Sequence, residues 1–419
     1  MGDYFRALFF RASVINSSLY FKDSLLMKKN TIDFDIIYNR QGTGSLKYDK
    51  YKGRDIIPMW VADMDFQAPE AVRNALRKRI DHGIFGYSVA TDEINAVVSK
   101  RLRSFYGWHI EKDWIVWLPG LVEALNIISR LVRADEQIIT FVPAYPPFID
   151  GPRYADRKLI TAPLLFDNGR YTFDLEKFEK AITPKTKLFI LCNPHNPVGR
   201  VYDADELRAV ADICLKNNIL VCSDEIHCEL ILSDKKHIPF ATLSKRTEDN
   251  SITLLSPAKT FNLAGLNCGF AVIPNAEIRK RFVRVKVGIA PPSVNALGFV
   301  ACQAAYSDCE EWKKSLLEYL KENKRIVYDF VNNKLSPLSM IDVEATYLAW
   351  IDVRKLNVPD PVKFFEQAGV GLSDGREFRV DGFVRLNFGC PRKRLLEALD
   401  RMKQAVMQEK TDNQFPITK

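Results

Sequence analysis

The chain has 419 residues, of which 47% are hydrophobic and 27% are charged, a globular composition that is ample for a large core. Lys and Arg (60) outnumber Asp and Glu (52), but the basic residues are scattered along the chain. We therefore predict no nucleic-acid partner. No apolar run reaches the roughly 18 residues that suggest a membrane span, so we also predict no membrane association.

Cysteine and histidine usage argues against disulfide and metal frameworks. The eight cysteines include no C-x-x-C pair, and several lie in apolar runs such as LFILC, which is typical of core residues in a reducing compartment. Only five histidines occur, and none belongs to an H-E-x-x-H motif. We predict a cytoplasmic protein without a metal site.

The N-terminal residues 1–29 are predicted to be an extension outside the fold. The first 26 of them lack the positively charged start of a secretory signal and include Asp3 and Asp23. Met27, which precedes KKNTIDFD, is an alternative start.

From residue 59 onward, helical and strand-like segments alternate. Helical spacing predicts helices at residues 69–80, 92–106, 121–132 and 203–218, the last with Asp203 and Glu206 at capping-box spacing. Apolar runs that end in turn residues or polar side chains predict strands at residues 113–118, 136–142, 187–192, 219–224 and 251–255. Apolar strands separated by helices favour a mainly parallel sheet that is covered on both faces.

The pattern changes after residue 300. Residues 307–333 predict one long amphipathic helix, and ATYLAWIDV and GFVRLNFGC indicate strands of a smaller α+β domain. We predict an α/β protein with these parts: a small-domain segment at 30–58, a large domain at 59–299, a connecting helix at 300–332, a C-terminal small domain at 333–410 and a tail at 411–419.

Polar side chains follow three of the predicted strands. They are Asn193 to Asn196, Asp224, and Ser256 to Lys259. In parallel α/β sheets, ligands bind beyond the carboxyl ends of the strands, so an amide, a carboxylate and an amine are expected along one edge. Taken alone, Lys259 is more typical of a side chain that reaches solvent from a loop.

A phosphate site is expected at the start of the helix that follows IVWL. Gly120, Leu121 and Val122 offer free backbone N–H groups at the positive end of the helix dipole. An anion site, a carboxylate, an amide and a lysine are together the parts that hold pyridoxal 5′-phosphate (PLP) as a Schiff base.

Seven motifs resemble a known family. LCNPHNPVGR, SDEIH, SPAKTFNLAGL and VRLNFGC, in this order, resemble the class I/II aminotransferase family of PLP enzymes. MWVADMDF, HGIFGYS and PAYPPF are similar to its cystathionine β-lyase or C–S lyase (MalY/PatB) branch. The resemblance covers about residues 30–408 and implies the PLP-dependent transferase fold of the aspartate aminotransferase type, with a mainly parallel seven-stranded sheet in the large domain.

The resemblance implies a role for each residue around the cofactor. Lys259 corresponds to the lysine that forms the Schiff base and serves as base, and Asp224 to the carboxylate on the pyridine nitrogen. Asn196 corresponds to the amide that bonds O3′, and Tyr145 to the aromatic ring that stacks on the pyridine, although packing alone also explains a tyrosine between prolines. The resemblance implies that the phosphate is bound by Ser256, itself a plausible turn residue, and by the backbone N–H groups of Gly120, Leu121 and Val122.

Four further positions bear on the partner, the substrate and the branch. Tyr87 resembles a tyrosine that reaches the phosphate of the neighbouring subunit, which implies a homodimer. Arg385 matches the arginine that grips the substrate α-carboxylate. His227 stands where many members have a tyrosine near O3′, and Asn267 where many place a phosphate-binding arginine.

The implied activity is cleavage of cystathionine or cysteine S-conjugates to a thiol, pyruvate and ammonia. Aminotransfer from an amino acid to a 2-oxo acid is the first alternative, because it needs the same lysine, aspartate and arginine. A PLP-fold protein with a regulatory or binding role is the second. A nicotinamide dehydrogenase is not expected, since no G-x-G-x-x-G follows a strand.

Overall fold

The computed structural model describes residues 32–414, and the chain divides after Phe34 into two units. The residues from Asp35 onward form a compact unit of their own. The predicted extension at 1–29 lies outside the described residues, as does the end of the predicted tail beyond residue 414. The other domain limits stay a prediction.

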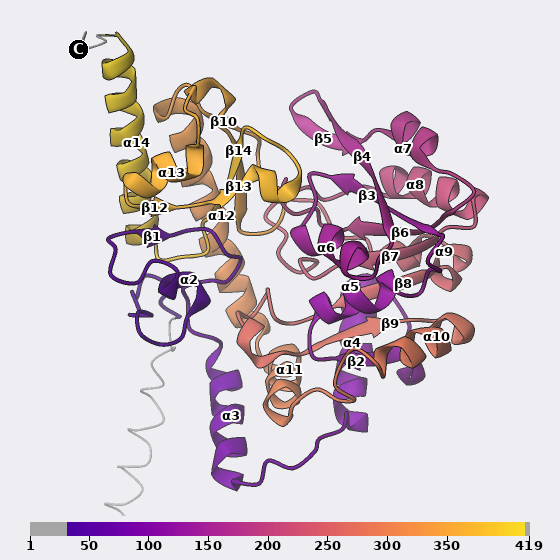
Figure 1. The fold of residues 1–419 in the computed structure, drawn as a ribbon. Coiled ribbons are helices and arrows are strands. Elements are labelled where there is room, and N and C mark those ends of the chain that lie inside the picture. Colours follow the sequence, from indigo (N-terminus) through magenta and orange to yellow (C-terminus); the bar gives the residue numbers. More distant parts are fainter. Residues whose placement is uncertain (1–31, 415–419) are drawn as a thin grey trace, which may run out of the picture. The chain divides into compact units, whose positions relative to one another are not determined.

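An eight-stranded sheet forms the centre of this unit (Figure 1). Its order is β2 (Ile115–Leu118), β9 (Gly269–Val272), β8 (Ser251–Leu255), β7 (Leu220–Asp224), β6 (Thr186–Cys192), β3 (Gln137–Val142), β4 (Lys158–Asp167) and β5 (Arg170–Phe173). The strands from β8 to β4 pair in parallel, whereas β9 and β5 are antiparallel to their neighbours. The α/β class and the mainly parallel sheet are therefore confirmed.

The predicted number of seven strands is one too low. The additional strand, β5, comes from a hairpin in which Asp167 pairs with Arg170 across Asn168 and Gly169. Both loop residues have positive φ, 48° and 76°, as a type I′ turn requires, and Asn-Gly is a strong sequence signal for that turn. The hairpin extends the edge of the sheet beyond β4.

Helices cover both faces of the large sheet. The first face packs against α5 (Leu121–Ser129), α6 (Pro146–Tyr154) and α10 (Ala276–Lys286), and the second against α7 (Leu175–Ala181), α8 (Ala204–Lys216), α4 (Asp92–Tyr106) and α11 (Ala296–Asp308). Strand β6 illustrates why. Its Leu188 and Ile190 enter the first core and its Phe189 and Leu191 the second, because alternate side chains of a strand point to opposite faces.

Several predicted helices are found, and one of them has its predicted cap. In α8, the side chain of Asp203 accepts from the Glu206 amide and the Glu206 side chain accepts from the Asp203 amide, which is the predicted capping box. The helix predicted at 307–333 is α12 (Glu310–Lys334), separated from α11 at Cys309. Helices α3 (Glu70–His82) and α9 (Lys245–Asp249) complete this part of the chain.

A second, smaller sheet lies beside the first, with α12 alongside it (Figure 1). It contains β10 (Ser339–Met340), β11 (Leu348–Asp352), β14 (Phe383–Asn387) and β13 (Ser373–Asp374), all antiparallel. A parallel pair, β1 (Ile57–Pro58) with β12 (Val370–Gly371), joins the early part of the chain to the C-terminal part. The accompanying helices are α2 (Leu46–Asp49), α13 (Pro361–Gln367) and α14 (Arg392–Gln414).

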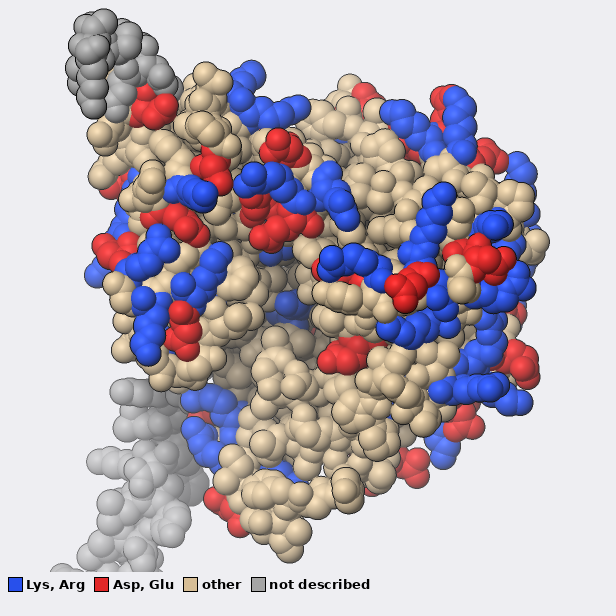
Figure 2. Space-filling view, in the orientation of Figure 1, with Lys and Arg blue, Asp and Glu red and all other residues tan. Residues whose placement is uncertain are grey.

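Charged side chains of both signs are interspersed over much of the face shown in Figure 2. Among residues 32–414, no helix is both long enough and apolar enough to cross a membrane.

Candidate active site

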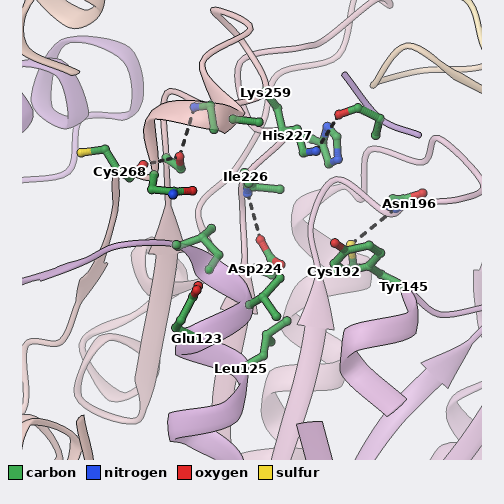
Figure 3. Close-up of a pocket in the computed structure, with 18 of the residues that line it drawn as sticks. Glu123, Leu125, Tyr145, Cys192, Asn196, Asp224, Ile226, His227, Lys259 and Cys268 are labelled. Atoms are coloured by element: carbon green, nitrogen blue, oxygen red, sulfur yellow. Dashed lines mark hydrogen bonds between the residues drawn. The ribbon is translucent and has the colours of Figure 1, made fainter. Parts of the chain in front are cut away.

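A cavity of 310 Å³ lies at the carboxyl ends of strands β6, β7 and β8, where ligands bind in open α/β sheets. Its wall contains all of the predicted site residues except Tyr87, namely Gly120, Leu121, Val122, Tyr145, Asn196, Asp224, His227, Ser256, Lys259 and Arg385. In Figure 3, Lys259 and His227 lie together above Asp224, with Tyr145 and Asn196 on one flank and Glu123 and Cys268 on the other. The fold thus gathers groups that are up to 265 positions apart in sequence.

Lys259 follows β8 and lies half-buried in the cavity wall. Its Nζ donates a hydrogen bond of 2.6 Å to the carbonyl oxygen of Ala62, and no carboxylate of the described residues forms an ion pair with it. Burial and then the charge of Arg385 lower the pKa of Lys259 to about 8, while Asp63 and Asp224 oppose the shift. A larger fraction of this amine is therefore free and nucleophilic near neutral pH than in a lysine with its ordinary pKa.

Asp224 is the last residue of β7 and is buried. Its Oδ1 accepts a hydrogen bond of 3.1 Å from the Ile226 amide. Burial raises the pKa of Asp224 to about 7, against the effects of the Ile226 amide and the charge of Lys259. A carboxyl group in this state holds a proton weakly at neutral pH and is poised to share it with a buried basic nitrogen.

Arg385 extends from β14 of the small sheet and is also buried. Its guanidinium donates to Asn196 Oδ1 at 3.0 Å, to the Trp60 carbonyl oxygen at 3.0 Å and to Ser373 Oγ at 3.3 Å. The Nε–H has no partner in the described part of the chain, and no carboxylate there pairs with the guanidinium. Because a buried cation without a counter-ion is costly, this arginine suits an anionic ligand.

Two rings border the cavity near these charges. His227 is buried, its Nδ1 has no hydrogen-bond partner in the described residues, and burial holds its pKa well below the usual range, so the ring is neutral. Tyr145 caps the start of α6, and burial raises its pKa to about 12, so the phenol is also neutral. Both rings can contact a ligand without adding charge.

The start of α5 forms the opposite end of the cavity. Gly120 is its N-cap and no side chain caps the helix, so the backbone N–H groups of Gly120, Leu121 and Val122 are free for an anion. Ser256 Oγ, by contrast, donates to the Cys268 carbonyl oxygen at 2.7 Å and accepts from the Ala258 amide. Asn267 also lines this end, in a left-handed conformation with φ 50°.

Tyr87 does not reach this cavity. It is fully exposed in the loop between α3 and α4 and borders a separate cavity of 810 Å³. Within the single chain, the structure therefore separates Tyr87 from the other predicted site residues.

Several cavity residues were not predicted. Val61 and Ala62 lie in the MWVADMDF motif, which was identified as a resemblance without a role for any residue in it. Glu123 is the third residue of α5, and a Cβ on Gly120 would lie 2.5 Å from its Oε2, so its carboxylate folds back over the helix start. The cavity is also lined by Pro119, Leu125, Cys192, Ile226, Ala258, Ala264 and Cys268. Several of these residues lie in quoted motifs, among them Val61, Ala62 and Cys192, but the contact that Ala62 makes through its backbone carbonyl leaves no trace in residue type.

Within the described residues, no group of three or more His, Cys, Asp or Glu side chains has the arrangement of a metal site. All eight cysteines are buried and unpaired.

Comparisons with known proteins identify what the chain resembles. The family model for aminotransferase class I and II matches residues 54–402. A Bacillus subtilis (strain 168) protein named cystathionine beta-lyase PatB is 36% identical over 90% of this chain and 100% of its own length.

Solved structures agree with this similarity. The structure of OvoB is 44% identical with a TM-score of 0.87, and the alignment covers 89% of this chain and 99% of OvoB. The PLP-bound C-S lyase from Staphylococcus hominis is 33% identical with a TM-score of 0.84, covering 89% and 98% of the two chains.

Proposed function

Since the chain belongs to the aminotransferase class I and II family, we propose that it is a PLP-dependent carbon–sulfur β-lyase. Its substrates are cystathionine or other cysteine S-conjugates, and its products are a thiol, pyruvate and ammonia. One observation carries the proposal: Lys259, Asp224 and Arg385 line one cavity, and none of them has an ion-pair partner among the described residues. Groups with perturbed pKa values in one cavity are typical of an active site.

The cavity fits pyridoxal 5′-phosphate in size and in its donor set. Its volume of 310 Å³ is within the range of cofactor sites, and its two ends offer what the cofactor needs. The uncapped start of α5 suits the phosphate, and Asp224 suits the pyridine nitrogen. Lys259 would hold the aldehyde carbon, His227 and Asn196 would border the ring oxygen, and Tyr145 would lie against the ring.

When bound, the cofactor supplies an electron sink for the negative charge that develops at the substrate α-carbon. Residues of this chain perform the other steps. Arg385 binds the substrate α-carboxylate and so fixes the orientation of the α-carbon toward Lys259. The Lys259 amine, with its pKa lowered to about 8, takes the α-proton. The Cβ–S bond then breaks, the sulfur leaves with the bonding electron pair and takes up a proton, and the released enamine hydrolyses to pyruvate and ammonia.

A simple assay tests the proposed activity. We expect PLP-loaded protein to convert cystathionine to a thiol and pyruvate in equal amounts when no 2-oxo acid is present. Aminotransfer would instead require a 2-oxo acid and would leave the C–S bond intact. Absence of thiol and pyruvate, with amino-group transfer once an oxo acid is added, would contradict the lyase proposal. No turnover of any amino acid would favour a binding or regulatory role.

We further propose that the active unit is a homodimer in which Tyr87 reaches the phosphate of the partner's cavity. Three residues near Tyr87, Ile84, Phe85 and Val89, are exposed apolar side chains, so this loop offers a large unpaired apolar surface. Figure 2 supports this, because the lower centre of the face, over the α3–α4 loop and α11, carries few charges.

Mixing two impaired variants tests the role of Tyr87. We expect Tyr87→Ala to weaken PLP binding about tenfold, since it removes one hydrogen bond to a charged group. In a mixed dimer with Lys259→Ala, one cavity combines an intact Lys259 with an intact Tyr87, so tight binding and activity should return on mixing. Mixing Tyr87→Ala with itself is the control. A mixture that gains nothing would contradict a contribution from the partner subunit.

The remaining assignments are also proposals. The large domain at 59–299 and the small domain at 30–58 and 333–410 are supported by the separate sheets and by the β1–β12 pair. A cytoplasmic location is supported by eight unpaired cysteines.

A further inference from the structure

A second buried carboxylate, Glu225, directly follows Asp224 and does not line the cavity. Its side chain is completely buried and accepts three hydrogen bonds. Ser223 Oγ and the Phe240 amide donate to Oε1 at 2.8 and 2.9 Å, and His237 Nε2 donates to Oε2 at 2.8 Å. The side chains of Ser223 and Glu225 are two positions apart and are hydrogen-bonded to each other. Both therefore point to the face of the strand end that is opposite to the Asp224 side chain.

The partner His237 is best satisfied as a neutral ring. It is buried, and its Nδ1 has no hydrogen-bond partner among the described residues. A proton on Nε2 alone supplies the donor that Glu225 accepts, whereas a charged ring would leave a buried Nδ1–H without an acceptor. The Glu225–His237 pair therefore carries one negative charge close behind Asp224.

The backbone next to this pair is hydrogen-bonded on both sides of the strand end. The Glu225 amide donates to the Leu254 carbonyl oxygen at 3.0 Å, and the Glu225 carbonyl accepts from the Cys228 amide at 3.0 Å. These bonds extend the pairing of β7 with β8 and shape the turn that presents His227. On the other side, the Asn193 amide donates to the Asp224 carbonyl oxygen at 2.9 Å, and the Asn193 side chain donates to Ile238, next to His237.

We propose that Glu225, held by His237, is a positioning residue for Asp224: its three hydrogen bonds fix the end of β7, and its carboxylate lies behind the cavity carboxyl. The inference rests on the proposed function only in that Asp224 is taken as the partner of the cofactor nitrogen. The negative charge of Glu225 would favour a proton on that nitrogen, which strengthens the electron sink.

The electrostatics agree with this geometry. The charge of Glu225 raises the pKa of Asp224, in addition to the larger effect of burial. The other titratable groups around the two carboxyl groups are Tyr106, Tyr145, Cys192, Cys222, Cys228, His237 and Lys259. Burial raises the pKa of each of these tyrosines and cysteines above its ordinary value, so they stay neutral near pH 7 and Lys259 is the only cation among them.

The titration of Asp224 in the cofactor-free protein tests the proposal without any substrate. Carbon-13 NMR of aspartate carboxyl groups follows the titration, and Asp224→Asn identifies the signal. Glu225→Gln keeps the shape but removes the charge, and we expect the Asp224 midpoint to fall by about one pH unit, as one buried charge at short range predicts. An unchanged or higher midpoint overturns the proposal.

A matched control and a second pair of variants keep the test decisive. Glu229 is another buried carboxylate, four positions later and paired with Arg101 and Lys313, so Glu229→Gln should leave the Asp224 midpoint unchanged. His237→Leu removes the donor that holds the Glu225 carboxylate and should lower the Asp224 midpoint, whereas His237→Gln restores a donor and should return the midpoint toward wild type. If Glu225→Gln does not fold, equal midpoints in these two His237 variants overturn the proposal. Absence of lyase activity in the wild-type protein, together with the expected midpoint shift in Glu225→Gln, would instead contradict the proposed function alone.

Discussion

Lys259→Ala is expected to lower the rate of β-elimination by about 10⁴-fold or more, because the variant loses both the covalent anchor of the cofactor and the base that takes the α-proton. Two measurements check this result. Pyruvate release from cystathionine should fall to background, and borohydride reduction followed by peptide mass spectrometry should find no cofactor attached to the chain. In wild type, the reduced link should map to Lys259.

Two variants separate chemistry from charge. Lys259→Arg keeps a cation in the cavity but offers no amine that can attach the cofactor, so it should be as inactive as the alanine variant. Lys286→Ala is the matched control, because burial lowers the pKa of Lys286 as well, although this lysine lies outside the cavity. It should retain activity and the reduced link. A reduced link at another lysine in Lys259→Ala would refute the assignment.

Asp224→Asn is expected to lower kcat by about 10²–10³-fold, because an amide cannot stabilise a protonated ring nitrogen as a carboxylate does. KM should change much less, since Asp224 does not contact the substrate carboxylate, which is assigned to Arg385. The measurement is steady-state kinetics with cystathionine at saturating cofactor. Equal kcat values in Asp224→Asn and wild type would contradict the assigned role.

The same variant should change how the stability of the cofactor-free protein depends on pH. Folding raises the pKa of Asp224 from 3.8 to about 7, so the native state binds more protons than the unfolded state between these values. As pH rises from about 4 to about 7, the ionisation of Asp224 therefore lowers the free energy of unfolding by roughly 4 kcal/mol.

Urea unfolding of wild type and Asp224→Asn at a series of pH values isolates this effect. Burial lowers the pKa values of His195 and His227, which acts in the opposite direction in part of this range, but both histidines are common to the two proteins. Lys259 contributes at higher pH, between about 8 and its ordinary value of 10.5. The difference between the two proteins should decline from about pH 4 to about pH 7, and a flat difference would contradict the raised pKa.

Much of the site could be predicted because its parts follow strands. Asn196, Asp224 and Lys259 come directly after apolar runs, and parallel strands bring their carboxyl ends to one edge of a sheet. The identity of the family rested on local motifs, which are preserved in residue order. Arg385, however, was assigned only through the motif VRLNFGC, since nothing in a strand of the small sheet indicates that it faces a cavity in the large one.

The hairpin strand β5 was missed, although its turn has a recognisable sequence signal. Asn168-Gly169 is the favoured pair for a type I′ turn, but residues 158–173 alternate in burial as an edge strand does and did not stand out as an apolar run. The role of Glu225 was also missed, although the residue stands in a quoted motif. The motif SDEIH was used only for the family resemblance, whereas the three hydrogen bonds of Glu225 come from residues up to 15 positions away.

Residue types and their order thus determined the class of fold, the family and the chemical groups of the site, because apolar periodicity and strand-end motifs are local properties of the chain. Their charge states depended on folding. The pKa of Lys259 falls and that of Asp224 rises because packing removes water from both groups, and because the fold brings Arg385 close to Lys259. The hydrogen bond from the Lys259 amine to the carbonyl oxygen of Ala62 also depended on folding. A backbone acceptor is present at every residue, so it gains a role only from the contacts that the fold creates.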